Sequence, residues 1–278
     1  MLSLAGELRE NPGLTTAMGC KMAHENEYYD NMVTMLELIW GEGYMAPGGA
    51  GNVARMLSGI DTRGKKILDI GCGIGGPAFE MVRTHGGIVT GIDLEEPLIQ
   101  RATGRASELG LQDNAKFQVV EVGPLPFEDE SFDIVTTAGA LTQTSDKAAV
   151  FRDCRRVLVP GGYLSCYDWT RSDREYSDDM YHWFKVEGLT YALETLENYG
   201  RILESCGFED VVLEDASEWY RIRAREEYEL IKGELYPRMV ELLGQADADH
   251  FVENWRALVV VCENGEMLQG YSRGRKAI

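Results

Sequence analysis

The sequence has few basic residues, and this limits the partners that the protein can have. It contains 27 lysines and arginines against 46 aspartates and glutamates, a formal net charge of −19 at neutral pH. A field of that sign repels nucleic acid and anionic lipid and favours cationic or zwitterionic partners. We therefore expect no nucleic-acid partner and no membrane partner, and a small zwitterionic molecule fits the charge better.

Long apolar runs and paired metal-binding residues are also missing. No apolar run approaches the ~18 residues that a membrane span needs, and residues 1–13 lack the regions of a signal peptide. The six cysteines form no C-x-x-C pair, and the four histidines are isolated. These absences predict reduced thiols, a cytoplasmic location and no metal site.

Short apolar runs alternate with helical patterns, and this rhythm predicts an α/β fold. Such alternation is typical of a Rossmann-like, mostly parallel sheet with helices on both faces. The helical patterns between the runs include 98–110 and 146–158. We predict seven strands, at 65–70, 87–93, 116–122, 132–139, 161–169, 208–215 and 266–276.

The flanks of this core predict further helices. Residues 30–40 place apolar side chains on one helical face, and 41–52 are expected to be a loop. We also expect a helix over 190–208, and one or two helices over 217–243, broken near Pro237. The chain then forms one domain over 1–278, divided into an N-terminal helical lid or cap (1–62), a ligand-binding core (63–170) and substrate-side helices with the last strands (171–278).

The segment KILDIGCGIGGPA (66–78) follows the first strand and contains the pattern G-x-G-x-x-G. A glycine loop at this position opens the ligand-binding edge of such a sheet. Asp69 precedes Gly71 by two residues, and its carboxylate suits an ammonium group better than a pyrophosphate. Asp93 ends the second strand, where an acid binds ribose hydroxyls. An NAD enzyme would share Asp93, so that residue alone does not discriminate.

The ordered set LDIGCGIGG, GID, FQVVEV, PFEDESFDIV and VLVPGGYL resembles the motifs of class I S-adenosylmethionine-dependent methyltransferases. The resemblance covers about residues 65–170. It implies S-adenosyl-L-methionine as the cofactor and S-adenosyl-L-homocysteine as its product. By this resemblance, Gly71 and Gly73 contact the methionyl part of the cofactor, and Asp93 contacts its ribose. Leu94, Glu121 and Val122 contact its adenine, and Thr137 contacts its sulfonium.

The flanks resemble phosphoethanolamine N-methyltransferases more loosely. The segment NEYYDNMVTMLELIWGEGYMAPGG matches that family's N-terminal lid, whose tyrosine corresponds to Tyr28. The lid continues into a segment matched here by 44–49, so Met45 and Ala46 join the expected cofactor-binding residues. The family's other substrate-side aromatics correspond to Trp169 and Tyr191.

Several functional positions of that family are replaced in this chain. Its Asp and His after the fourth strand fall on Ala138 and Thr142, and its phosphate-binding Arg and Lys fall on Leu189 and near Leu258. A thioether or tertiary amine needs no base before methylation, whereas an ammonium acceptor must first lose a proton. Aromatic faces favour the cation that forms. We therefore expect no general base, and substrate positioning at the catalytic site by Tyr28, Trp169 and Tyr191.

The first choice of acceptor is the thioether of methionine, giving S-methylmethionine, as in the bacterial enzymes that begin dimethylsulfoniopropionate synthesis. Tyr29, Arg171 and Arg174 are the candidate substrate-binding residues, the arginines as a carboxylate clamp. The alternative is an N-methyltransferase for phosphoethanolamine or glycine-type amines, which would need Arg223 or Arg273 as a replacement cation.

Two readings from other classes stay open as well. A non-catalytic cofactor-binding protein fits the replaced residues. An NAD-dependent oxidoreductase is the disfavoured one of the two. The sequence does not fix the number of methyl groups transferred or the oligomeric state, for which a homodimer is one option.

Overall fold

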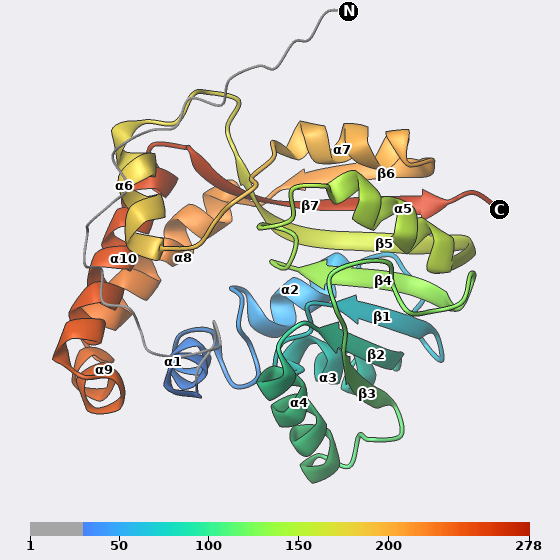
Figure 1. The fold of residues 1–278 in the computed structure, drawn as a ribbon, viewed down its shortest axis with the longest axis horizontal. Coiled ribbons are helices and arrows are strands. Elements are labelled where there is room, and N and C mark those ends of the chain that lie inside the picture. The colour runs from blue at the N-terminus through green and yellow to red at the C-terminus, as the bar shows by residue number, and fades with distance from the viewer. Residues whose placement is uncertain (1–29) are drawn as a thin grey trace, which may run out of the picture.

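The computed structural model describes residues 30–278, built around one seven-stranded sheet (Figure 1). The strand order is β3-β2-β1-β4-β5-β7-β6, and β7 alone runs antiparallel to its neighbours. This confirms the predicted Rossmann-like, mostly parallel sheet and each of its seven strands. The strands are β1 (Lys66–Ile70), β2 (Ile88–Asp93), β3 (Ala115–Val119), β4 (Phe132–Ala138), β5 (Leu158–Arg171), β6 (Phe208–Asp215) and β7 (Met267–Lys276).

Helices cover both faces of the sheet. Adjacent residues of β1 point to opposite faces, so Ile67 packs among α2, α3 and α4, while Leu68 packs among α5 and α7. Both side chains are fully buried, as expected for a central strand of a parallel sheet. The helices on these faces are α2 (Gly49–Met56), α3 (Gly76–Arg83), α4 (Glu96–Glu108), α5 (Lys147–Val157) and α7 (Leu196–Ser205).

A second group of helices stands beside the carboxyl edge of the sheet, at the left of Figure 1. Its core joins Met35, Trp183, Tyr220 and Trp255 from four different helices. We call this group the helical arm. It consists of α1 (Asp30–Trp40), α6 (Asp178–Glu187), α8 (Ser217–Lys232), α9 (Tyr236–Leu243) and α10 (Gln245–Glu263).

The helix predictions for the flanks need four corrections. The helix expected over 190–208 begins only at Leu196, because the Thr195 hydroxyl caps it by accepting from the Asn198 N–H. The loop expected over 41–52 ends early, since α2 begins at Gly49. The break expected near Pro237 comes before it, because proline is tolerated in the first turn of a helix, here α9. Helices α6 and α10 were not predicted.

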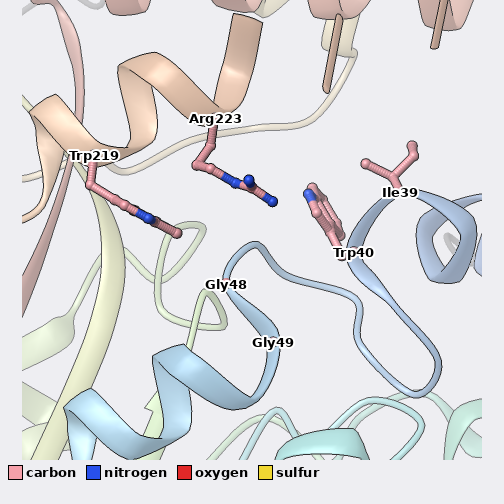
Figure 2. Close-up of a pocket in the computed structure, with 6 residues that line it drawn as sticks. All are labelled: Ile39, Trp40, Gly48, Gly49, Trp219 and Arg223. Carbon is pink, nitrogen blue, oxygen red and sulfur yellow. The ribbon is translucent and has the colours of Figure 1, made fainter. Parts of the chain in front are cut away.

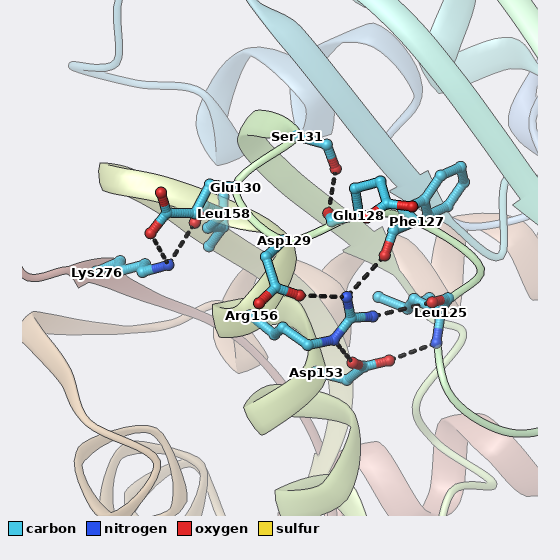
Figure 3. Close-up of polar contacts among 10 residues, drawn as sticks. All are labelled: Leu125, Phe127, Glu128, Asp129, Glu130, Ser131, Asp153, Arg156, Leu158 and Lys276. Atoms are coloured by element: carbon cyan, nitrogen blue, oxygen red, sulfur yellow. Dashed lines mark hydrogen bonds and ion pairs between the residues drawn. The ribbon is translucent and has the colours of Figure 1, made fainter.

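Arg156 makes most of the side-chain contacts that hold the PFEDESFDIV segment, and Lys276 adds an ion pair with Glu130 (Figure 3). The guanidinium of Arg156 on α5 donates to the carbonyls of Phe127 (2.7 Å) and Leu125 (2.9 Å). It also pairs with Asp129 (3.0 Å) and Asp153 (2.6 Å). These bonds fix the loop between β3 and β4, so this part of the motif has a structural role.

Candidate active site

The glycine loop joins β1 to α3 in a conformation that only glycine adopts easily. Gly71 has φ +69° and Gly73 has φ +53°, both in the left-handed region. A Cβ on Gly71 would overlap the Cβ of Ala140 in the loop after β4. The N–H of Gly71 donates to the carbonyl of Ile92 (2.8 Å), which fastens the loop to the end of β2.

Asp93 is oriented by two backbone N–H groups. Gly73 donates to its Oδ2 (2.9 Å) and Glu95 donates to its Oδ1 (3.1 Å). A carboxylate accepts about four hydrogen bonds, so each oxygen has capacity for another donor. The side chain is thus fixed at the sheet's carboxyl edge, where a ribose diol would find two acceptors.

Two buried oxygens beside the glycine loop lack a hydrogen-bond partner among the described residues. One is Oδ2 of Asp69, whose Oδ1 accepts from the Thr136 hydroxyl (2.8 Å). The other is the hydroxyl of Thr137 at the end of β4. Burial raises the pKa of Asp69 to about 7, helped by the negative charge of Asp93. An unpaired, buried carboxylate oxygen suits an ammonium group, so the site fits the amino-acid part of S-adenosylmethionine.

The segment after α1 lies over the glycine loop. The N–H of Gly76 donates to the carbonyl of Gly43 (3.0 Å), which joins the two backbones. The sulfur of Met45 lies 3.1 Å from where a Cβ on Gly73 would stand, and Ala46 lies near Gly139 at the end of β4. The structure therefore places Met45 beside the glycine loop and Ala46 beside the end of β4, and their contact with the cofactor stays a prediction.

The residues assigned to adenine also lie at the carboxyl edge but are open to solvent. Leu94 directly follows β2, and Glu121 and Val122 follow β3. The side chains of Leu94 and Val122 are 54% and 88% exposed. Exposed apolar side chains at this edge agree with a flat apolar ligand group between them, and their contact with adenine stays a prediction.

Trp169 lies at the end of β5 and faces the helical arm. Its ring meets Tyr220 of α8 edge to face, with centroids 4.8 Å apart. Its neighbour Asp168 is fully buried and accepts from the Thr142 hydroxyl (2.5 Å), the Tyr199 hydroxyl and the Trp169 N–H (2.9 Å). Burial raises the pKa of Asp168 above its ordinary value, and the three donors oppose that shift.

A buried lysine supports the same network. Lys147 donates to the carbonyls of Thr144 (2.8 Å) and Ala192 (2.6 Å), and burial lowers its pKa. Its positive charge acts on Asp168 and partly offsets the cost of burying that carboxylate. Sequence reasoning missed both residues, although an acid at the end of the apolar run YLSCYDW was a signal.

The other predicted substrate-side residues are placed less favourably. Tyr191 stacks on Trp183 (5.0 Å between centroids), and its hydroxyl donates to Glu187 (3.0 Å). Arg171 donates to the carbonyls of Ser172 and Arg174, while Arg174 donates to the carbonyls of the two residues that follow α10. These bonds give both arginines a structural role, so the carboxylate clamp stays a prediction that the geometry does not favour. Tyr28 and Tyr29 lie outside the described residues.

The positions that the resemblance assigns to the family's phosphate-binding Arg and Lys are apolar in the fold as well. Leu258 is buried in α10 within the core of the helical arm, and Leu189 lies half-buried after α6. Arg273, one candidate replacement, pairs with Ser165 in the register of β5 and β7, four residues before Trp169. It donates to Ser58 (2.5 Å), away from the carboxyl edge. Arg223 on α8 is the better-placed candidate.

Figure 2 shows Arg223 and Trp219 pointing from α8 toward Trp40 and the turn at Gly48. These four residues line a pocket of about 270 Å³, together with Ile39 and Gly49. Sequence reasoning did not predict this pocket, because its walls come from segments about 180 residues apart. Among the described residues no helix could span a membrane, and no cluster of three metal-binding side chains occurs.

Comparisons with known proteins agree with this geometry. A family model described as a methyltransferase domain matches residues 61–226. Phosphoethanolamine N-methyltransferase 1 of Triticum aestivum is 31% identical over 246 residues, covering 88% of this chain and 48% of that protein. The phosphoethanolamine N-methyltransferase of Plasmodium falciparum is 30% identical over 198 residues, covering 70% and 73%. The chain thus spans about half the length of the plant relatives.

Solved structures show the same fold. Phosphoethanolamine N-methyltransferase 2 of Haemonchus contortus, in complex with phosphomonomethylethanolamine and S-adenosylhomocysteine, superposes with a TM-score of 0.83 at 23% identity, covering 91% of this chain and 59% of that one. A putative sarcosine dimethylglycine methyltransferase of Galdieria sulphuraria gives 0.71 at 22% identity, covering 88% and 86%. The chain therefore belongs to the class I S-adenosylmethionine-dependent methyltransferases and resembles the phosphoethanolamine N-methyltransferases.

Proposed function

We propose that this methyltransferase transfers methyl groups to a small amine that carries an anionic group, of the phosphoethanolamine class. The observation that carries the proposal is the similarity to proteins named phosphoethanolamine N-methyltransferase, which extends over 88% of the chain. This replaces methionine as the first choice of acceptor. The five cysteines of the described part are free and buried, which supports a reducing, cytoplasmic compartment.

S-adenosylmethionine supplies the methyl group, and the protein has to align the acceptor and exclude water. Trp169 stands at the end of β5 and offers an aromatic face to a methylated ammonium group, worth about 0.5–2 kcal/mol. The glycine loop and Asp93 hold the cofactor at the neighbouring strand ends. The cofactor and the acceptor thus meet where β4 and β5 face the helical arm.

A primary or secondary amine must lose a proton before it can accept a methyl group. By the family resemblance, Thr142 corresponds to a histidine of the phosphoethanolamine N-methyltransferases, and its hydroxyl donates to Asp168. The raised pKa of Asp168 makes its carboxylate a better proton acceptor than an exposed one. We propose that Thr142 passes the proton to Asp168 in place of the missing histidine.

Methylation of the methionine thioether is the second candidate. It is favoured by the apolar residues Leu189 and Leu258 at the phosphate-binding positions, and a thioether needs no proton acceptor. Under this alternative Asp168 has only a structural role, because no proton leaves the acceptor.

Mass spectrometry of the products separates these candidates. The purified protein is incubated with S-adenosylmethionine and, separately, ethanolamine phosphate, glycine, dimethylglycine or methionine. We expect methylated ethanolamine phosphate, and Asp93→Ala serves as the control with impaired cofactor binding. Methylation of methionine alone would reject the phosphobase proposal, and no methylated product with any acceptor would favour a non-catalytic role or an untested acceptor.

A further inference from the structure

The pocket of Figure 2 has a rigid aromatic wall. The indole N–H of Trp40 donates to Oε1 of Glu227 (2.9 Å), a residue buried in α8. Oε2 of Glu227 accepts from the Trp255 indole and from the Tyr220 hydroxyl, both at 3.2 Å. The other two donors hold the buried carboxylate in place, and the carboxylate in turn fixes the Trp40 ring in a single orientation.

The opposite side of the pocket presents a cation. Arg223 is half-exposed, and its only ion pair within the described residues joins it to Glu226 of the same helix (2.6 Å). Such an exposed pair contributes little free energy, so a better anion can displace it. The guanidinium offers a planar set of donors that matches the oxygens of a carboxylate or phosphate. Trp219 stands beside it in the same pocket.

The pocket lies close to the place of methyl transfer. Its floor is the turn at Gly48 and Gly49, and Gly48 follows Ala46 by two residues, a span of at most about 7 Å. Ala46 itself approaches Gly139, which directly follows β4. Trp169 contacts Tyr220, which shares Glu227 with Trp40. A small molecule in the pocket therefore reaches toward the end of β4 from the helical arm.

We propose that this pocket is the subsite for the acceptor's anionic group, with Arg223 binding its phosphate or carboxylate oxygens between Trp40 and Trp219. Glu227 is a positioning residue that acts through Trp40. The inference rests on the proposed function, because it assumes an acceptor with an anionic end. It explains how an anionic acceptor is held although Leu189 and Leu258 replace the expected cations.

The test compares two arginines of one helix. Arg223→Gln removes the pocket cation, and Arg225→Gln is the matched control, since Arg225 is equally exposed (51% against 50%) and pairs with Glu263 away from the pocket. Binding of ethanolamine phosphate and of dimethylglycine to the S-adenosylhomocysteine complex is measured by calorimetry, and KM and kcat are measured for every acceptor that turns over.

We expect Arg223→Gln to weaken acceptor binding and raise KM about 10- to 100-fold, the effect of a lost charge-assisted hydrogen-bond pair. Arg225→Gln should change both less than about twofold, by the small effect of exposed pairs. S-adenosylhomocysteine affinity should stay the same in both variants. The acceptor whose binding depends more strongly on Arg223 tells whether the subsite takes phosphate or carboxylate.

The two proposals fail in different ways. Acceptor binding that depends on Arg223, without any turnover, would reject the proposed function and keep the subsite. Turnover that is equal in the wild type and Arg223→Gln would reject the subsite and keep the function. Absence of binding of both acceptors to the wild-type complex would also reject the subsite.

The positioning role of Glu227 has its own readout. Glu227→Gln keeps one acceptor oxygen and places an amide N–H against a donor, so the Trp40 ring loses its fixed orientation. For Glu227→Gln we expect a several-fold higher KM for the acceptor and an unchanged S-adenosylhomocysteine affinity. Glu227→Asp should restore the wild-type KM only if its shorter carboxylate still accepts from the indoles of both Trp40 and Trp255. An equal loss of acceptor and S-adenosylhomocysteine binding would show general unfolding and reject the positioning role.

Discussion

The cofactor side and the acceptor side of the site are built in different ways. Asp69, the glycine loop and Asp93 lie within 25 consecutive residues, and the backbone of β1 and β2 alone brings them together. On the acceptor side, Trp40 and Glu227 are 187 residues apart and meet only after the helical arm has packed. The difference teaches that the cofactor site is a property of a local motif, whereas acceptor selection is a property of tertiary packing.

The largest effect is expected from a change that breaks the cofactor side alone. Gly71→Ala places a Cβ against Ala140 and forces an alanine into the left-handed region of φ, so the loop must shift. We expect S-adenosylhomocysteine affinity to fall by about 100-fold, the size of effect that a 1 Å displacement can produce. Gly64→Ala is the matched control, because Gly64 has the same φ of +69° and open space around it. Equal affinities in the two variants would contradict the steric argument.

The next effect concerns the junction between the two sides, where Asp168 accepts three hydrogen bonds. Asp168→Asn leaves one acceptor oxygen for three donors, so at least one of these hydrogen bonds is lost or reversed, which costs about 1–3 kcal/mol of unfolding free energy. That corresponds to a melting temperature lower by roughly 2–12 °C for a chain of this size. Thermal denaturation measures it, and Thr142→Val, which removes one donor only, should cost less. An Asp168→Asn variant as stable as the wild type would show that the hydrogen-bond network tolerates the replacement.

A smaller effect, confined to the cofactor side, is a pH dependence from Asp69. Its pKa is raised to about 7, so the protonated fraction grows as the pH falls below 7, and an ammonium group then loses its partner. We expect S-adenosylhomocysteine to bind about tenfold more weakly at pH 6 than at pH 8. Titration calorimetry measures this. Asp69→Asn should bind equally at both pH values, and a flat wild-type profile would remove Asp69 from the ammonium site.

The same residue makes a prediction for the unliganded protein. A carboxyl group whose folded pKa lies above its unfolded value holds a proton in the native state between about pH 4 and pH 7. Its contribution to stability is therefore greatest below that window and is lost as the pH rises through it. Comparing wild type with Asp69→Asn across this range isolates the contribution of Asp69 from those of the other acids.

The smallest effect sharpens the acceptor side. Glu226→Gln removes the anion that competes for Arg223, at a cost in stability below about 1 kcal/mol. We expect the KM for an anionic acceptor to fall by up to about fivefold. Glu241→Gln is the control, since Glu241 pairs with Arg238 at the same spacing on α9. A raised KM in Glu226→Gln would mean that Glu226 aligns Arg223 rather than competing for anions.

Local patterns in the sequence were enough to predict the sheet, whereas the cofactor contacts at its carboxyl edge stay a prediction. Alternating apolar runs located all seven strands, because strand periodicity is a local property. The predictions failed where packing decides the structure. No element was predicted for the apolar run ALVVV (257–261), which belongs to α10, and only its packing against the other helices of the helical arm distinguishes it from a strand.

The acceptor pocket was beyond prediction from sequence for the same reason. Helix α8 reads as a charged surface helix, yet Tyr220, Ala224, Glu227 and Ile231 form its buried stripe at helical spacing. A glutamate within an apolar stripe was a readable signal of a buried site. Its partners Trp40 and Trp255 carry no such signal, since nothing in their neighbouring residues tells that three helices converge.

The single hydrogen bond between Gly76 and Gly43 has a kinetic consequence. The turn that it fastens covers the glycine loop through Met45 and also forms the floor of the acceptor pocket at Gly48. We infer that release of the product and entry of new cofactor require this turn to lift, which dismantles the pocket next to it. Catalysis should accordingly follow a compulsory order in which the cofactor enters first and leaves last, with S-adenosylhomocysteine competing against S-adenosylmethionine but not against the acceptor.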